Sequence, residues 1–484
     1  MLSTLALLVA AGRPLSPECR PANGVDPRET LRAVRAALVP DAPGRVLHAT
    51  GLQSITQDYQ SDRSYPPFFS AMGDVELHFD PASGVMRSAD RVSYPGYGSP
   101  PPLVTLSTGS AVFAVRDTAQ VPVEAMFMST EQARYLNPVA VLSDWSASSI
   151  TVTGRCMYRD YQRLVLERTG SYGTERLFID EKTHIPVKLE REEPHYLWGQ
   201  VRVEFVWTNW NLAEGAEFPT TVFRLVDGDI ILSRTYADVR WAPKDSAPSL
   251  AMKDPEHRMS LVSPIFLQPL PVDTIRVSDR TYLLRNRGYA QAVVYARDTV
   301  FVLDATQGDA RARQDSAWIA RLYPNHKGIV LVVTDLAHPH IAGLRYWVSR
   351  GATVISHEAS RGFVQQVVAR RWTRTPDALE KHRQPLKFVG IRDSLVLGGG
   401  ALTLYPIDGI GSEGALMAFS HADRFLWASD YIQQLGTPTQ YAIEVLRASE
   451  RAGIVPGRVA AQHLPLTEWS KVVADQRGAR STGN

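Results

Sequence analysis

The sequence predicts an α+β protein made of a mainly antiparallel β region and a following region in which strands and helices alternate. Short apolar and polar alternations between residues 48 and 239 are separated by turn residues, which is typical of antiparallel strands with one solvated face. From residue 271 onward, apolar β-branched runs are interspersed with segments of helical periodicity. Residues 242–270 lack periodicity and are rich in proline and serine, which indicates a linker between two domains.

Length and charge narrow the classes of function. A chain of 484 residues is too long for one ordinary core, so we expect two domains. Its 52 basic and 50 acidic residues leave a net charge of +2, and no electrostatic field of that size gathers nucleic acid. No stretch has the length and apolarity of a membrane helix. We therefore predict a small-molecule ligand or substrate, no nucleic acid and no integral membrane segment.

The first residues and the cysteines bear on the compartment. Residues 1–12, MLSTLALLVAAG, form a short apolar run that ends in small residues, without a basic segment before it. We predict that they are a signal peptide and that the protein is periplasmic or secreted. Cys19 and Cys156 could form one disulfide in an oxidising compartment, but two cysteines are also a number found by chance.

Residues 13–241 are predicted to form the β-rich N-terminal domain. It begins with a helix over Pro27–Leu38, whose apolar residues share one face, and continues with short strands joined by turns such as Asp227-Gly228. The pattern of residues 177–239 resembles the curved antiparallel sheets of lipoprotein-carrier half-barrels. That resemblance implies a carrier of apolar ligands if aromatic side chains such as Trp207 and Tyr236 are exposed, whereas packing in the core is the alternative.

Residues 271–475 are predicted to form the C-terminal domain, followed by a disordered tail over 476–484. Four short strands open it, and a helix over residues 310–322 leads to the segment Ile329–His357, which reads IVLVVTDLAHPHIAGLRYWVSRGATVISH. The apolar run at its start indicates a buried strand, and the residues from Ile341 onward have helical spacing up to Gly351, a helix C-cap. Two histidines and an aspartate lie in the loop between them, where ligands bind in open α/β sheets.

This segment resembles the signature of the metallo-β-lactamase superfamily, in which a strand ends in Thr-His-x-His-x-Asp-His-x-Gly-Gly and the side chains hold one or two zinc ions. Thr334, His340 and Gly343 match the signature. The resemblance runs from about residue 274 to 475 and implies an αββα sandwich. Three ligand positions hold other residues, which are Asp335 and Ala337 in place of the first two histidines and Pro339 in place of the aspartate.

Two later segments complete the pattern. In relatives, a histidine precedes a Glu-Gly pair, an aspartate ends the next strand, and a final histidine follows a strand near the end. Gly411 stands in place of that first histidine, whereas Asp430 and His463 match the other two ligands. The three-histidine site is therefore lost, because one carboxylate cannot hold zinc where about three protein ligands are needed.

The resemblance then implies at most one zinc ion, held by His340, Asp430 and His463, with Asp335 and His338 as less favoured candidates. Each retained side chain also has an ordinary structural explanation, such as a helix cap, a carboxylate on backbone amides or a buried imidazole. The aspartate that orients water in relatives is replaced by Pro339, which has no acid or base group. No catalytic residue is assigned.

The resulting hypothesis is a hydrolase-like protein of the metallo-β-lactamase fold with a degraded dinuclear site and weak or absent hydrolysis. If it is active, the superfamily implies metal-dependent hydrolysis of an ester, thioester, amide or phosphoester. One alternative is a catalytically inactive protein that binds a ligand or partner in the same cleft. Another is transport of an apolar ligand by the N-terminal sheet.

Overall fold

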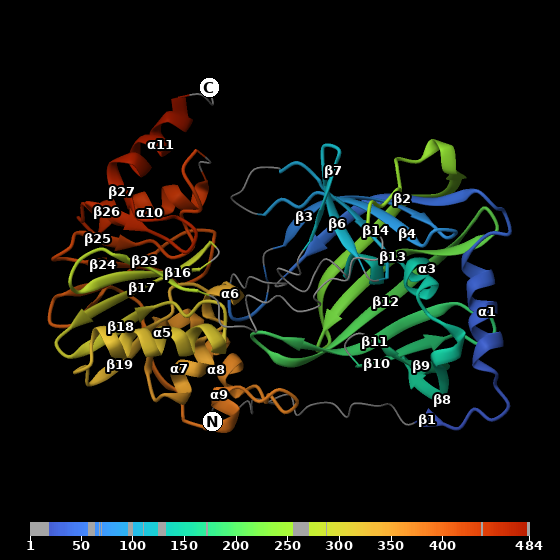
Figure 1. Ribbon diagram of the computed structural model, residues 1–484, viewed down its shortest axis with the longest axis horizontal. Coiled ribbons are helices and arrows are strands. Elements are labelled where there is room, and N and C mark those ends of the chain that lie inside the picture. The colour runs from blue at the N-terminus through green and yellow to red at the C-terminus, as the bar shows by residue number, and fades with distance from the viewer. Residues whose placement is uncertain are drawn as a thin grey trace, which may run out of the picture.

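A computed structural model describes residues 19–56, 63–66, 68, 70–94, 100–109, 111–123, 132–170, 173–254, 271–286, 288–436 and 439–481. The strands form three sheets of 14, 7 and 6 strands. The large sheet lies to the right in Figure 1, and the two smaller sheets lie to the left. Strands and helices are both present, which agrees with the predicted mixed class.

The N-terminal sheet is antiparallel throughout. Its order is β1-β8-β9-β10-β11-β12-β13-β14-β2-β3-β4-β5-β6-β7, so β2 pairs with the last strand as well as with the next one. The strands are β1 Cys19–Arg20, β2 Arg45–Ile55, β3 Ala71–Asp80, β4 Val85–Asp90, β5 Leu103–Ser107, β6 Val112–Arg116, β7 Ala119–Pro122, β8 Ile150–Tyr158, β9 Tyr161–Gly170, β10 Gly173–Ile179, β11 Pro186–His195, β12 Gly199–Ala213, β13 Ala216–Val226 and β14 Asp229–Pro243.

Period-two alternation determines which face of this sheet is buried. Alternate residues of β2 and β3, such as Leu47 and Leu77, enter one core with α1 (Pro27–Leu38) and α3 (Pro138–Ser143). The predicted helix over Pro27–Leu38 is confirmed, and the Asp26 side chain caps it by accepting from the Arg28 N–H at 2.8 Å. Trp207 and Tyr236 lie in this core rather than on an exposed face.

The two cysteines join the first strand to the sheet. Cys19 on β1 lies opposite Cys156 on β8 and forms a disulfide with it. This covalent link adds to the few ladder bonds that a two-residue strand can form. The predicted turn at Asp227-Gly228 is also present, with positive φ at both residues, as a two-residue hairpin loop requires.

The first C-terminal sheet changes from antiparallel to parallel at β18. Its order follows the chain from β15 to β21, and β18, β19, β20 and β21 run parallel. One face packs against α5 (Asp309–Leu322), α7 (Leu344–Ser349) and α8 (Arg361–Ala369). The strands are β15 Asp273–Arg276, β16 Thr281–Asn286, β17 Tyr289–Ala296, β18 Thr299–Leu303, β19 Gly328–Val332, β20 Thr353–His357 and β21 Lys387–Ile391.

The second C-terminal sheet packs face to face with the first. Residues from both sheets, such as Phe301 and Trp427, share one core. The outer face of the second sheet packs on α10 (Gln440–Arg451) and α11 (Trp469–Ser481), so helices cover both sides of the sheet pair. The strands are β22 Leu395–Leu397, β23 Leu402–Ile407, β24 Ala415–Ser420, β25 Phe425–Trp427, β26 Arg458–Ala460 and β27 Thr467–Glu468.

The short helices connect these layers. None of the described helices is long and apolar enough to cross a membrane. The short elements are α2 Gln132–Tyr135, α6 His338–Ile341, α9 Ala378–Lys381 and the 3₁₀ turns η1 Ala147–Ser149, η2 Lys244–Ser246 and η3 Glu358–Ser360.

Of the predicted C-terminal tail, signal peptide and linker, the structure describes the tail to Ser481 and the linker to residue 254. The tail predicted to be disordered from residue 476 is instead helical to Ser481, because α11 continues that far. Residues 1–12, predicted as a signal peptide, lie outside the described residues, as do residues 255–270 of the predicted linker. Residues 247–254 contain no helix or strand.

The turn between β11 and β12 contacts the C-terminal region. Leu197 is buried in the core of the first C-terminal sheet, and the ring of Trp198 lies edge-on to Phe363 of α8, with centroids 5.3 Å apart. Arg370, which follows α8, donates to the carbonyl oxygens of Trp198 and Gln200 at 3.0 and 2.9 Å. These contacts join the N-terminal sheet to α8 and the residues that follow it.

Candidate metal centre

The three predicted ligands come together where strands of the two C-terminal sheets end. His340 lies in α6 after β19, Asp430 follows β25, and His463 follows β26. The Nε2 atom of His463 is 3.5 Å from Asp430 Oδ1, and the Nε2 atom of His340 is 3.9 Å from the same oxygen. These three ligand atoms lie within 4.8 Å of one another, a spacing that one metal ion can bridge.

His340 is held by a carboxylate behind its ring. Its Nδ1 atom lies 3.4 Å from both oxygens of Asp335, while Nε2 faces Asp430. Burial lowers the pKa of His340, but the charges of Asp430 and Asp335 outweigh burial and raise this pKa to about 9. The surroundings of the ring therefore favour positive charge.

A backbone carbonyl group orients His463 so that its Nε2 atom, like that of His340, faces Asp430. Its Nδ1 lies 2.8 Å from the carbonyl oxygen of Gly288, so the proton of a neutral ring is on Nδ1 and the lone pair of Nε2 faces Asp430. The side chain is 30% exposed, which leaves one side of the group open to solvent. The buried ring of Tyr289 packs edge-on to both histidines, with centroid distances of 6.0 Å to His340 and 5.1 Å to His463.

Asp335, a less favoured candidate ligand, lies behind His340 and is itself held by hydrogen bonds. It accepts hydrogen bonds from the Ala337 N–H at 2.8 Å and from the Ser429 hydroxyl at 2.7 Å. Burial raises the pKa of Asp335, but the neighbouring His340 and these hydrogen bonds outweigh it and lower the pKa overall. The Asp335 carboxylate is thus placed to orient the ring of His340.

A second buried carboxylate, Asp304, lies beneath the group. It accepts from the Thr334 hydroxyl at 2.7–2.8 Å, from Trp427 Nε1 at 2.9 Å and from Gln462 Nε2 at 2.8 Å. These donors belong to the three segments that carry the predicted ligands. Burial and the charge of Asp335 raise the pKa of Asp304 to about 7.

Sequence reasoning missed Asp304, Tyr289 and Ser429. A charged residue that directly follows the apolar strand at 299–303 was a usable signal for Asp304, because a buried carboxylate needs several donors. Tyr289 carried no signal, since aromatic residues at strand starts are most often part of the core.

The remaining candidates lie away from the group. His338 points toward the N-terminal region, where its ring lies edge-on to Trp198 at 5.8 Å and stacks on Phe363 at 5.7 Å. Its selection as a candidate ligand is not supported by this position. A side chain at Gly411 would begin 2.7 Å from the ring of Tyr441, so the lost family histidine does not fit there without a shift of that ring.

The residues present suit a zinc ion. Two imidazole nitrogens and one carboxylate oxygen are the ligand types of catalytic zinc, and three protein ligands leave an open position. Each histidine also has an acceptor at its other nitrogen, which fixes the ring as metal ligands usually require.

Comparison with known proteins identifies structural neighbours only. No family model matches the sequence, and no curated protein matches it. The DIM-1 metallo-beta-lactamase is 13% identical, with a TM-score of 0.35 over 44% of this chain and 98% of its own. A metallo-beta-lactamase from Pontibacter korlensis is 12% identical, with a TM-score of 0.34 over 43% of this chain and 98% of its own.

A third neighbour is the metallo-beta-lactamase FIM-1 from Pseudomonas aeruginosa in its mono-zinc form. It is 13% identical, with a TM-score of 0.34 over 44% of this chain and 97% of its own. The interpretation of the C-terminal region therefore rests on its own sheets, helices and side chains.

Proposed function

We propose that the C-terminal region is a metallo-β-lactamase-like αββα domain that binds one zinc ion through His340, Asp430 and His463. The observation that carries this proposal is the orientation of the two histidines. Each directs Nδ1 to an acceptor and Nε2 toward the same oxygen of Asp430. The packing of two sheets between helices supports the domain type.

We further propose that this site hydrolyses generic substrates weakly or not at all. A zinc ion with an open position would supply Lewis-acid chemistry. Among the described residues, neither Pro339 nor Asp335 provides a base beside it, because Pro339 has no titratable group and Asp335 is buried behind His340, bonded to Ser429 and Ala337. Binding of a ligand or partner in the same cleft without turnover is the alternative.

Two further proposals concern the whole chain. The division into domains at 13–241 and 271–475, with a linker over 242–270, stays a proposal that the separate hydrophobic cores support. Export to an oxidising compartment stays a proposal that the Cys19–Cys156 disulfide supports. A carrier role for the N-terminal sheet has no such support, because Trp207 and Tyr236 are packed inside the core.

The test combines zinc titration with activity assays on the wild type, His463→Ala and Asp430→Asn. We expect zinc binding to weaken in both variants, whereas His382→Ala, which changes an exposed histidine, binds like the wild type. Activity on ester, lactam and phosphoester substrates should be very weak, and any activity should depend on zinc and on both ligands. Strong turnover that survives both substitutions would place the active site elsewhere.

A further inference from the structure

A second group of potential ligands lies on the N-terminal sheet, far along the chain from the first. His48 on β2 and His78 on β3 are direct cross-strand partners, and Glu76 lies two residues before His78 on the same strand. All three side chains therefore leave the sheet on one face. This face, called the outer face here, is opposite the one whose Leu47 and Leu77 enter the N-terminal core.

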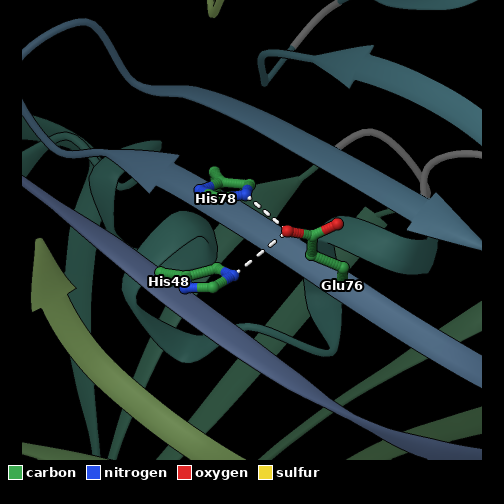
Figure 2. A group of neighbouring side chains, drawn as sticks. All are labelled: His48, Glu76 and His78. Atoms are coloured by element: carbon green, nitrogen blue, oxygen red, sulfur yellow. Dashed lines mark hydrogen bonds and ion pairs between the residues drawn. The ribbon is translucent and has the colours of Figure 1, made fainter. Parts of the chain in front are cut away.

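The three side chains converge on one oxygen (Figure 2). His48 Nε2 is 3.1 Å from Glu76 Oε1, and His78 Nε2 is 3.0 Å from the same atom. Two ligands of a tetrahedral zinc ion are about 3.3 Å apart, given bonds of about 2.0–2.1 Å. The three ligand atoms all lie within 4.8 Å of one another. The distances from Glu76 Oε1 to the two Nε2 atoms are thus close to the spacing between two ligands of one zinc ion.

Burial limits the movement of both histidine rings. His48 and His78 are both buried, so each ring is held close to the position shown in Figure 2. Among the described residues, His78 Nδ1 has no hydrogen-bond partner, so Nε2 provides the polar contact of this ring.

The carboxylate completes the site and leaves it accessible. One oxygen of Glu76 already contacts both imidazoles, at 3.1 Å from His48 and 3.0 Å from His78. The side chain is 43% exposed, which allows an ion to enter and a further ligand to bind.

We infer that His48, Glu76 and His78 form a second site for a divalent transition-metal ion of the zinc type. Two nitrogens and one oxygen favour zinc over calcium or magnesium, which prefer oxygen ligands. The two rings are now parallel, 4.3 Å apart, and they must tilt so that both Nε2 atoms reach one ion. Among the described residues, no acceptor holds His78 Nδ1. The zinc affinity of this site should therefore be lower than that of a closed structural zinc site.

The inference raises the expected zinc content of the chain from one ion to two. It is independent of the C-terminal site, so the test uses full-length protein in which that site has been removed by His340→Ala and His463→Ala. After removal of metal with a chelator and exchange into metal-free buffer, this double variant is titrated with Zn²⁺. We expect one remaining equivalent and a zinc-dependent rise in the unfolding temperature.

Glu76→Gln in the same background is the decisive variant, because it keeps the size of a half-exposed side chain and removes the charged ligand. Zinc affinity should fall by more than the roughly 10- to 100-fold typical of lost outer-shell partners, and the thermal shift should disappear. Asp74→Asn is the matched control, since Asp74 lies on the same strand and face and is 61% exposed.

Cobalt gives a second readout that does not depend on stability. When Co²⁺ is added to the double variant, binding by two histidines and a carboxylate should give the strong visible absorption of a cobalt ion with a low coordination number. Glu76→Gln should abolish this absorption. An absence of zinc binding in the double variant, or zinc binding that Glu76→Gln leaves unchanged, would overturn the inference. Neither result depends on whether the C-terminal site binds zinc.

Discussion

Asp335 is a buried carboxylate whose contacts position a neighbouring histidine. The buried carboxylate faces Nδ1 of His340 and not the open side of the site. A carboxylate at that nitrogen orients the ring and makes Nε2 a better ligand. Asp335 is therefore the residue that would orient His340 for the proposed zinc ion.

This arrangement makes a prediction for Asp335→Ala. The substitution removes the acceptor that orients His340, so zinc affinity at the C-terminal site should fall by roughly 10- to 100-fold. The measurement is zinc titration in a Glu76→Gln background, where only the C-terminal site is expected to bind. Asp408→Ala serves as the control because that side chain is 81% exposed. An unchanged affinity would show that Asp335 does not support the ligand.

The candidate ligands could be predicted from the sequence because their segments resemble a known ligand signature and each segment follows a recognisable apolar strand. His340, Asp430 and His463 are found at strand ends, as expected. Asp304 and Tyr289 could not be assigned in this way, because their roles depend on which segments meet in space. The same holds for His48 and His78, which are thirty residues apart in sequence and adjacent only through the register of β2 and β3.

At the scale of elements, the helix predicted from Ile341 is interrupted. The structure has α6 and α7 with Ala342 and Gly343 between them. The Gly343 N–H donates to the Ala305 carbonyl at 2.7 Å, and the Ala305 N–H donates to the His340 carbonyl at 2.8 Å. Periodicity could not reveal this break, because contacts with the end of β18 cause it.

Gly343→Val tests the importance of this close approach. A Cβ atom at this position would lie 3.1 Å from both the Ala305 oxygen and the Ala312 Cβ. We expect a loss of about 1–3 kcal/mol in unfolding free energy, as overpacking typically costs, and weaker zinc binding because α6 must shift. Gly328→Ala is the control, since its nearest neighbour would be 3.9 Å away. Equal effects of the two substitutions would contradict the explanation.

The turn after β11 predicts a response to acid. His195 is buried, and its Nδ1 accepts from the N–H groups of Leu197 and Trp198 at 3.1 Å each. Burial, together with His338, Arg224 and Arg370, holds the pKa of His195 well below its ordinary value. The unfolded chain therefore binds a proton more readily, and stability should be full above about pH 6.5 and fall as the pH drops below it.

His195→Asn should remove this part of the acid sensitivity, because an amide oxygen can accept the same two bonds without titrating. At pH 5.5, the stability lost by the wild type relative to pH 7.5 should exceed that lost by the variant by about 1.4 kcal/mol. Denaturant unfolding at the two pH values measures the difference. Parallel pH dependence in the two proteins would argue against a neutral His195.

At the scale of the molecule, a few side chains join the two regions. Arg370 reaches the backbone of the β11–β12 turn and also pairs with Asp227 at 2.6 Å. Ser64, from the N-terminal region, donates to the carbonyl oxygen of Ala359. The sequence predicted strands and helices on both sides of this junction but not the junction itself, because no local pattern marks a contact between segments so far apart.

Arg370→Gln should weaken the junction without damage to either core. Lost hydrogen bonds from a charged group cost about 1.5–3 kcal/mol, so we expect the two regions to unfold at more clearly separated denaturant concentrations. Tryptophan fluorescence and far-ultraviolet circular dichroism, recorded on the same samples, measure that separation. Arg371→Gln changes a neighbouring arginine that pairs with Glu380 within the C-terminal region and should leave cooperativity unchanged.

The position of β2 in the large sheet determines the order in which the chain can fold. Strands β8–β14 follow one another as neighbours, whereas β2 pairs its Arg45 with Pro243 at the far end of the region. Closing so long a loop is slow, because chain entropy is lost before the ladder bonds form. During synthesis, one edge of β2 therefore stays unpaired until β14 has been made, and an exposed edge of eleven residues can pair with other chains in the meantime.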